Sequence, residues 1–310
     1  FSLKKYETKG ESAFLKKLFT RTLLIFLIGL FLNGFPFVYR DALQGWQVMN
    51  FADIRIMGVL QRIALCYCIG GLLIRYLSTK PLLVVSTGLL LIYWWLMYHF
   101  GDAGDPYSLK GNAELKFDLV FFNPKNLYHG YAIPFDPEGL LSTIPAIVNV
   151  IGGYLAGMFI QKSGNNFNTV WKLALGGLVL LGVALLWSPL FPINKPIWTS
   201  SYVLYTIGWD TLLLGALIFV TEVINFKKGA YFFEVFGRNP LFIYILSGVI
   251  IEIISLIHIG GESLKKLIYE EVFLSWLSAL NASLLFAFCY MLLLWLIALW
   301  MDKRSIYIKV

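Results

Sequence analysis

Two arginines and a glutamine interrupt an apolar stretch that is long enough to cross a bilayer. Arg55 and Arg62 are seven residues apart, and Gln61 precedes the second arginine. On a helix this spacing places both arginines on one face, roughly 10 Å apart along the axis. A guanidinium in a membrane costs about 2.5 to 3.5 kcal/mol on insertion scales and therefore needs a partner. The stretch predicts either an interfacial anchor at Arg55 with a structural ion pair at Arg62, or an anion-binding role in a polar interior.

Residues 135–143 form a second polar stretch, Phe-Asp-Pro-Glu-Gly-Leu-Leu-Ser-Thr, which opens an apolar segment. Asp136 suits the N-cap of a helix, Pro137 its first position and Glu138 its first turn, so capping alone explains the pattern. The functional alternative is that Asp136 or Glu138 binds a polar substrate at the mouth of a cavity.

Aromatic and hydroxyl side chains gather in residues 194–202, Asn-Lys-Pro-Ile-Trp-Thr-Ser-Ser-Tyr. Trp198 is typical of a membrane interface, yet an aromatic face beside hydroxyls such as that of Ser201 also suits a sugar. The stretch is therefore a candidate for the entrance of a saccharide.

A cation precedes a helix start at residues 237–240, Gly-Arg-Asn-Pro. Asn239 followed by proline is a common helix start, which is the structural interpretation. Arg238 beside a helix N-terminus would also attract phosphate, which is the functional one.

The composition requires that membrane-spanning helices position these groups. Hydrophobic residues make up 58% of the 310 residues and charged residues only 14%. This excludes an ordinary soluble domain and predicts an all-α polytopic bundle of about eight spans. The net charge of +7 fits basic loops beside a membrane, so nucleic acid is not an expected partner, and no metal-binding spacing is present. The expected spans are residues 22–39, 54–74, 81–100, 140–160, 173–190, 198–220, 240–257 and 282–300.

Loop charge orients these spans. Of the 25 lysines and arginines, 15 fall in loops on one side and seven on the other, and the positive-inside rule assigns the richer side to the cytoplasm. Both Phe1 and Val310 are then cytoplasmic, and residues 101–139 form an outer loop of a single domain, residues 1–310. The basic stretch 1–21 is interpreted as a cytoplasmic loop that follows earlier helices absent from this chain.

With this orientation, four intramembrane polar groups fall at similar depth. At 1.5 Å per residue, Asn149, Asp210 and Glu252 share a layer with Arg62. They would form either an ion-pair network between helices or the wall of a hydrated cavity, and we favour the cavity because charges facing lipid are rare.

Four ordered motifs, at residues 55–67, 135–143, 194–204 and 237–244, resemble the heparan-α-glucosaminide N-acetyltransferase-like transmembrane acyltransferases, here as a bacterial inner-membrane member. The resemblance implies transfer of an acetyl group from cytoplasmic acetyl-CoA to an amino sugar or other saccharide on the outer face. It also implies a catalytic histidine and asparagine upstream of residue 1, so the catalytic residues cannot be assigned in this chain.

Within this framework, Gln61, Arg62, Arg238 and Asn239 are expected to bind acetyl-CoA, and Arg55, Asp136, Glu138, Trp198 and Ser201 the saccharide. The alternative class is a transporter or flippase of a sugar or lipid-linked saccharide, in which the buried charges would relay protons. The bilayer and the saccharide are the expected partners, and a homo-oligomer is compatible with the sequence.

Overall fold

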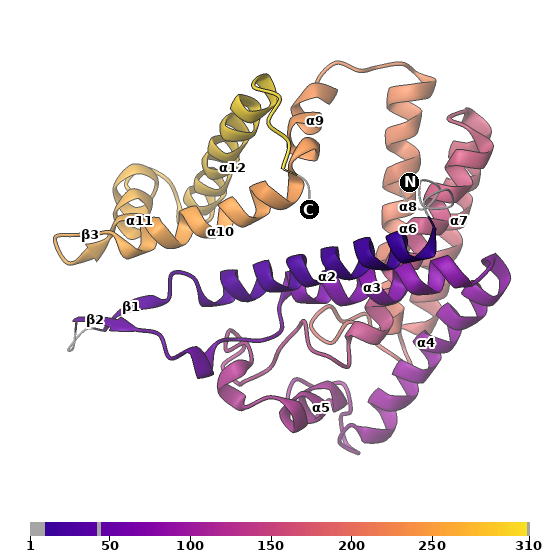
Figure 1. The fold of residues 1–310 in the computed structure, drawn as a ribbon, viewed down its shortest axis with the longest axis horizontal. Coiled ribbons are helices and arrows are strands. Elements are labelled where there is room, and N and C mark those ends of the chain that lie inside the picture. The colour runs from indigo at the N-terminus through magenta and orange to yellow at the C-terminus, as the bar shows by residue number, and fades with distance from the viewer. Residues whose placement is uncertain (1–9, 42–44, 309–310) are drawn as a thin grey trace. The chain divides into compact units, whose positions relative to one another are not determined.

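The structure, a computed structural model, describes residues 10–41 and 45–308 and is mostly helical, with irregular segments between several of the helices (Figure 1). Its strands form two short antiparallel hairpins in the described residues. The helices are α2 (Glu11–Gly34), α3 (Val59–Tyr76), α4 (Thr79–Phe100), α5 (Ala113–Phe121), α6 (Thr143–Ser163), α7 (Phe167–Trp187), α8 (Ser200–Ile218), α9 (Ala230–Arg238), α10 (Pro240–Leu256), α11 (Leu264–Leu267) and α12 (Ala279–Lys303). The hairpins are β1 (Val38–Asp41) with β2 (Gly45–Val48) and β3 (His258–Ile259) with β4 (Glu262–Ser263), and the π-helical segments are Phe219–Val223 and Ile268–Leu274.

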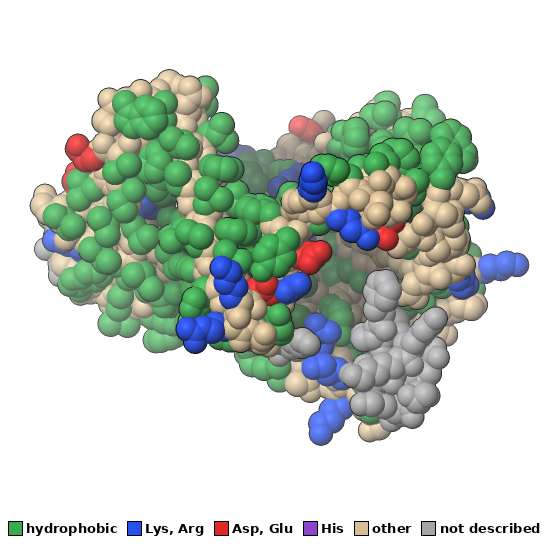
Figure 2. Space-filling view, turned by 90° about the horizontal axis from the view of Figure 1, so that it is seen from above, with side chains coloured by type: hydrophobic (Ala, Val, Ile, Leu, Met, Phe, Trp, Pro, Cys, Tyr) green, Lys and Arg blue, Asp and Glu red, His purple; other side chains and the backbone are tan. Residues whose placement is uncertain are grey.

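Six helices of the described residues are long and apolar enough to cross a membrane: α3, α4, α6, α7, α8 with its π-helical extension, and α12. The pair α9 and α10, bent by 80°, makes a seventh if it counts as one span. Hydrophobic side chains also cover much of the surface seen in Figure 2. The predicted polytopic helical bundle is therefore confirmed, and these spans imply a surrounding lipid bilayer.

Against the expected eight spans, the part of the chain that the structure describes contains six or seven candidate spans. The predicted first span, residues 22–39, has no counterpart among the six or seven. Its residues belong to α2, which begins at Glu11 and ends at Gly34, before strand β1. The basic segment expected as a loop is thus helical from Glu11 onward, while residues 1–9 and Val310 lie outside the described residues.

The contacts within the chain divide it into two compact units. The first consists of Phe1–Leu30 and Ala52–Phe226, and the second of Phe31–Phe51 and Lys227–Val310. The single domain expected over residues 1–310 stays a prediction.

The first unit is built around the closely packed antiparallel pair α7 and α8. Gly177 and Gly208 face one another, and a Cβ at Gly177 would lie 2.8 Å from the Gly208 carbonyl oxygen. Small residues allow such close helix approach in membranes. At one end of this unit, α5 and the irregular segments around it cover the helix ends and bury Tyr93, Phe135 and Phe191 completely.

The second unit contains α9, α10 and α12, which pack around Val235, Ile243, Leu294 and Ala298. Asn239 is the N-cap residue of α10 and Pro240 follows it, as the sequence predicts.

Candidate functional site

Arg55 precedes α3 and does not lie on it. The chain is not helical from residue 54 to residue 58, and α3 begins at Val59. The expectation that Arg55 and Arg62 share a helix face is therefore wrong. The irregular approach to the helix instead lets the Arg55 side chain reach Asp136, which accepts hydrogen bonds of 2.8 Å from Nε and 2.7 Å from Nη2, and Glu138, which accepts one of 2.5 Å.

Asp136 does not cap a helix. Its Oδ1 accepts a hydrogen bond of 3.0 Å from the Glu138 backbone, and its carbonyl accepts one of 3.1 Å from Gly139, which closes a tight turn. Helix α6 begins only at Thr143, with Ser142 as its N-cap residue. The capping interpretation of Asp136 is therefore wrong, because its carboxylate is committed to Arg55 and to its own turn.

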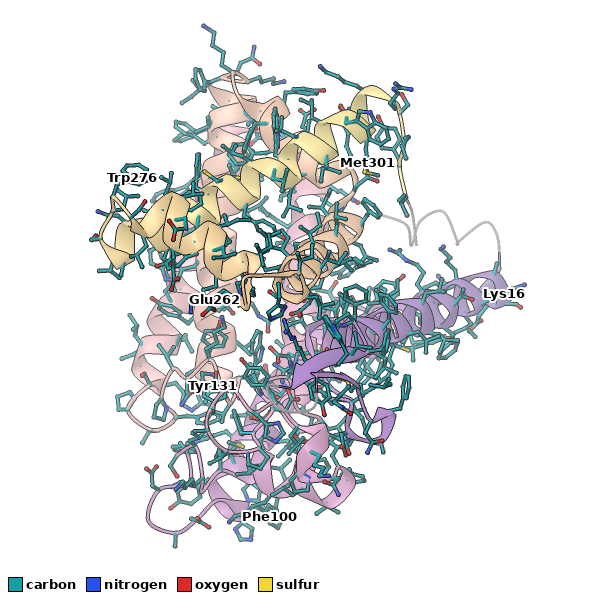
Figure 3. The ribbon with its side chains drawn as sticks, turned by 90° about the vertical axis from the view of Figure 1, so that its left-hand side faces the viewer. Lys16, Phe100, Tyr131, Glu262, Trp276 and Met301 are labelled. Carbon is teal, nitrogen blue, oxygen red and sulfur yellow. The ribbon has the colours of Figure 1, made fainter. Side chains whose placement is uncertain are left out.

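The structure brings three of the predicted saccharide-binding residues, Arg55, Glu138 and Trp198, to the wall of one pocket of about 280 Å³. Two tyrosines and one further cation complete its polar lining: Tyr128, Tyr131 and Lys195. Tyr131, labelled in Figure 3, projects from the irregular segment between α5 and α6. We call this cavity the Arg55 pocket.

Both aromatic rings and charged side chains line the Arg55 pocket. The Arg55 guanidinium carbon lies 4.8 Å from the Tyr128 ring centroid. Asp136 is 1% exposed and sits behind Arg55, while the side chain of Glu138 keeps 20% of its surface exposed. Glu138 is therefore the carboxylate that a ligand in the pocket can reach.

Arg62 lies in the first turn of α3, where it is 5% exposed. Its Nη2 donates to the Ser142 hydroxyl and, at 3.4 Å, to the Gly139 carbonyl oxygen. The guanidinium carbon stands 4.9 Å from the centroid of the Trp198 ring, a cation–π arrangement. Trp198 thus contacts Arg62 and also lines the Arg55 pocket.

Two carboxylates that the sequence analysis did not single out lie beside Arg62. Glu114 is fully buried with its Oε1 3.8 Å from Arg62 Nη2, and Asp118 is one helical turn further along α5. The sequence does contain a pattern that points to them. Asn112 caps the start of α5 with its side chain, and the two acidic residues that follow it are four residues apart, so they share one face of that helix. The sequence alone does not indicate that this pair folds against Arg62.

Burial changes the ionisation of both carboxyl groups of α5. Loss of solvation raises the pKa of Glu114 well above its ordinary value. The same effect raises the pKa of Asp118 to about 7, although Asp118 Oδ1 accepts a hydrogen bond of 3.0 Å from the Leu140 backbone. Burial therefore favours the protonated form of both carboxyl groups, relative to carboxyl groups on a protein surface.

Several buried polar atoms around Arg62 have no hydrogen-bond partner among the described residues. They are Nε and Nη1 of Arg62, Nε2 of Gln61, both carboxylate oxygens of Glu114 and Oδ2 of Asp118. Such atoms are uncommon in folded proteins and are typical of sites that bind water or a ligand. Gln61 is held against Gly29 of α2, where any Cβ would lie 2.6 Å from its amide carbon.

The remaining predicted residues of the first unit are arranged differently. Asn149 binds Trp198, whose Nε1 donates to its Oδ1 at 3.1 Å, and it donates to Thr206 at 3.1 Å. Asp210 is exposed on α8, and Ser201 is fully buried with its hydroxyl donating to the Phe191 carbonyl oxygen at 2.6 Å. Asn149 is thus the member of the expected polar layer that the structure connects to Trp198.

In the second unit, Arg238 and Asn239 make contacts within the fold. Arg238 pairs with Asp302 and, at 3.4 Å, with Glu234. The Asn239 side chain donates to the Ile306 carbonyl oxygen at 2.9 Å and accepts from the Ile308 backbone at 2.8 Å. Glu252 lines a separate pocket of about 210 Å³ with Tyr244 and Ser247.

No model of a known protein family matches the chain. The chain is similar to heparan-alpha-glucosaminide N-acetyltransferase of Homo sapiens, with 25% identity over 252 residues, which cover 64% of this chain. The two proteins are distant homologues. The family resemblance predicted from the four motifs is therefore confirmed, and the chain is a membrane protein related to a transmembrane N-acetyltransferase. It spans 37% of the length of the human relative.

Proposed function

We propose that this chain is the acceptor-binding part of a membrane acetyltransferase that uses acetyl-CoA and acetylates an amino sugar or another saccharide. The observation that carries the proposal is the Arg55 pocket. It combines an accessible carboxylate, that of Glu138, with aromatic rings, and one of these rings, that of Trp198, contacts the buried Arg62. Homology to an N-acetyltransferase supports the same reaction class.

The chemistry of the pocket suits a single amino sugar. Glu138 can accept a charge-assisted hydrogen bond from an ammonium group, and the hydrogen bond that Arg55 donates to it orients the carboxylate. The faces of Tyr128, Tyr131 and Trp198 can stack on the apolar face of a sugar ring. A volume of about 280 Å³ is at the small end for ligand sites, which favours one terminal residue of a saccharide.

Acetyl transfer requires an amine without its proton and a polarised thioester carbonyl. The amine nitrogen forms the new bond to the acetyl carbon, the carbon–sulfur bond breaks, and CoA leaves as a thiol after taking a proton. Arg62 has two unpartnered donor nitrogens, Nε and Nη1, that suit the developing oxyanion. The general base is not assigned to any of the described residues.

The donor would approach from the cytoplasmic side and end near Gln61 and Arg62. The contacts of Gln61 and Arg62 support this role more directly than those of Arg238 and Asn239, because the Asn239 side chain is occupied by residues 306–308. Binding of CoA phosphates by Arg238 would require competition with Asp302.

The test is acetyl transfer by the full-length protein in proteoliposomes that are supplied with acetyl-CoA and glucosamine. We expect release of CoA thiol together with N-acetylglucosamine, both measured by mass spectrometry. Glu138→Gln is expected to raise the KM for glucosamine about tenfold or more while changing the KM for acetyl-CoA little. Lys125→Gln, an exposed residue outside the pocket, is the matched control.

Two outcomes would contradict the proposal. One is an equal effect of Glu138→Gln on both KM values, which would separate the Arg55 pocket from the acceptor. The other is uptake of a saccharide by the proteoliposomes without any acetylated product, which would favour the transporter class instead.

A further inference from the structure

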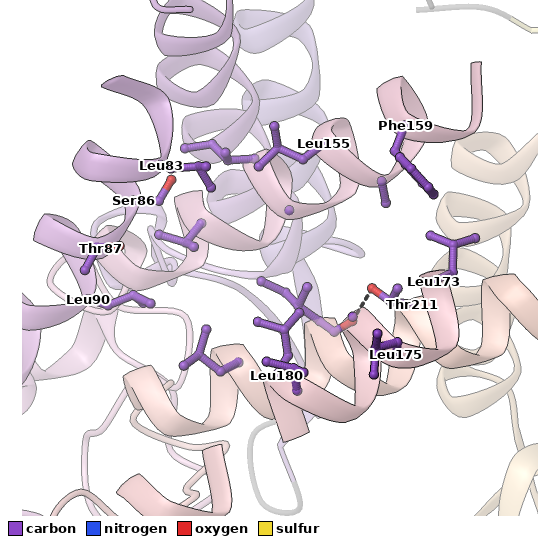
Figure 4. A pocket seen from close by; sticks show the side chains of 18 of the residues that line it. Leu83, Ser86, Thr87, Leu90, Leu155, Phe159, Leu173, Leu175, Leu180 and Thr211 are labelled. Atoms are coloured by element: carbon purple, nitrogen blue, oxygen red, sulfur yellow. Dashed lines mark hydrogen bonds between the residues drawn. The ribbon is translucent and has the colours of Figure 1, made fainter. Parts of the chain in front are cut away.

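A second cavity, of about 690 Å³, lies among α4, α6, α7 and α8 of the first unit. It shares no lining residue with the Arg55 pocket. Figure 4 shows side chains of these helices, among them Leu83, Leu155 and Leu180, directed toward one space. We call it the tail cavity.

The lining of the tail cavity suits hydrocarbon rather than a polar ligand. Most of its side chains are leucine, isoleucine, valine, alanine or phenylalanine. The hydroxyls of Ser86 and Thr211 donate to carbonyl oxygens of their own helices, at 2.8 Å to Leu82 and 2.7 Å to Ile207. Their donors are therefore used, which leaves Thr87 and Lys172 as the side chains of the lining that could donate to a sugar or nucleotide, too few to replace its hydrogen bonds to water.

The cavity can be reached from the side of the helix bundle. Leu175 and Val179 of α7 line it and are 51% and 57% exposed. Both belong to a helix that is apolar enough to span the membrane. The open side of the cavity therefore faces the hydrocarbon of the bilayer.

The length of the tail cavity matches one leaflet. On α6 the lining runs from Val148 to Phe159, a distance of roughly 16 Å at 1.5 Å per residue. The hydrocarbon core of a bilayer is about 30 Å thick, so the cavity extends over about half of it. One acyl chain of a lipid in one leaflet spans a similar length.

A single cation marks one end of the cavity. Among the residues that line it, Lys172 alone is charged, and it lies in the second turn of α7. The neighbouring Trp171 is 58% exposed, as expected for a tryptophan at the level of the lipid head groups. Lysine at this level attracts the phosphate of an anionic lipid.

We propose that the tail cavity binds one acyl chain of an anionic phospholipid whose head group pairs with Lys172. The apolar lining, the open side, the one-leaflet length and the terminal lysine carry this assignment together. It stands independently of the acetyltransferase proposal, because it concerns different residues of the same unit.

A glycine of α7 offers a direct way to fill the cavity. Gly176 lines it, and a Cβ added there would meet nothing within 4 Å, so Gly176→Leu can start a side chain at the cavity wall without a clash at its Cβ. Gly182→Leu is the matched control, because Gly182 has the same free space on the same helix outside the cavity. Both changes improve helix propensity, so loss of the fold is not expected.

The experiment measures retention of phosphatidylglycerol and phosphatidylcholine by the purified full-length protein, using native mass spectrometry in detergent. We expect the wild type and Gly182→Leu to retain one phosphatidylglycerol molecule per chain and Gly176→Leu to retain none. Lys172→Gln should reduce the preference for phosphatidylglycerol over phosphatidylcholine about fivefold, which corresponds to about 1 kcal/mol for one lysine near a membrane surface. Lys162→Gln, at the end of α6 but outside the cavity, should keep the preference.

Three results would overturn the assignment. Equal lipid retention by Gly176→Leu and Gly182→Leu would mean that the lipid only coats the protein surface. Equal retention of both lipids by the wild type would remove the role of Lys172. Release of the bound lipid on addition of CoA would show that the cavity accepts the pantetheine arm of the donor.

Discussion

Arg55 and Asp136 form a two-point ion pair across 81 residues of sequence, with hydrogen bonds of 2.8 and 2.7 Å. The pair fastens the segment before α3 to the turn before α6. Because both segments lack regular backbone hydrogen bonding, their positions depend on such side-chain contacts. The wall of the Arg55 pocket is therefore maintained by an ion pair rather than by a helix.

Replacing Arg55 with lysine keeps the charge but removes the planar fork. A lysine can bind Asp136 or Glu138 at one point, so we expect Arg55→Lys to lower the free energy of unfolding by about 1.5 to 3 kcal/mol. Denaturant unfolding in detergent measures the change. Lys125→Gln breaks a more exposed ion pair with Asp53, 3.6 Å long, and should cost at most about 1 kcal/mol. Equal losses in the two variants would show that the fork does not matter.

The second prediction separates the two interpretations of Arg62. Arg62→Met leaves the buried Glu114 without its cation and should destabilise the protein by at most about 3 to 5 kcal/mol. The loss is smaller where Glu114 takes up a proton, because no buried charge is then left without a partner. Adding Glu114→Gln should restore the melting temperature, since no buried charge remains. We expect the double variant to be stable but inactive in acetyl transfer. Restored activity would make Arg62 purely structural.

The third prediction concerns the glycine between the two carboxylates. A Cβ at Gly139 would overlap Asp118 Oδ2 and lie 2.8 Å from Glu114 Oε1. Gly139→Ala should therefore cost about 1 to 3 kcal/mol through overpacking. Gly153→Ala on α6 meets nothing within 4 Å and should stabilise the protein by up to about 1 kcal/mol. Thermal unfolding of the two variants provides the comparison, and an unaffected Gly139→Ala would refute the packing described for this turn.

The fourth prediction follows from the raised pKa of about 7 for Asp118. Between the ordinary pKa near 4 and this value, the folded protein holds a proton that the unfolded chain has released. The free energy of unfolding should then fall as pH rises from about 4 to about 7, by at most about 1.4 kcal/mol per pH unit from this group. Asp118→Asn should flatten the slope measured by thermal unfolding, whereas the exposed Asp105→Asn should not. If Asp118→Asn leaves the slope unchanged, Asp118 does not hold this proton in the folded protein.

The fifth prediction tests the orientation, for which loop charge supplies the argument. Cysteines at Lys162 and Lys227 should react with an impermeant maleimide only after the inner face is opened. Cysteines at Gly104 and Lys195 should react in intact cells. The opposite pattern would place the Arg55 pocket on the cytoplasmic side.

The sequence by itself determined the membrane class, the helical bundle and three of the residues that gather at the Arg55 pocket. Apolar runs near the length of a bilayer can only form helices there, because lipid cannot satisfy backbone hydrogen bonds. Arg55, Glu138 and Trp198 could be predicted because polar and aromatic side chains at the ends of such runs have few structural uses. The sequence predicted eight spans, whereas six or seven helices of the described residues are long and apolar enough to cross, and the predicted first span, residues 22–39, overlaps α2, which ends at Gly34.

Only the tertiary structure decided which charges meet. Depth along separate helices suggested Asp210 or Glu252 as the partner of Arg62, but the carboxylate beside it is Glu114 on α5. Depth is a one-dimensional quantity, whereas an ion pair also depends on helix rotation and on how a loop folds over helix ends. The raised pKa of Asp118 has the same origin, because it arises from burial by segments distant in sequence.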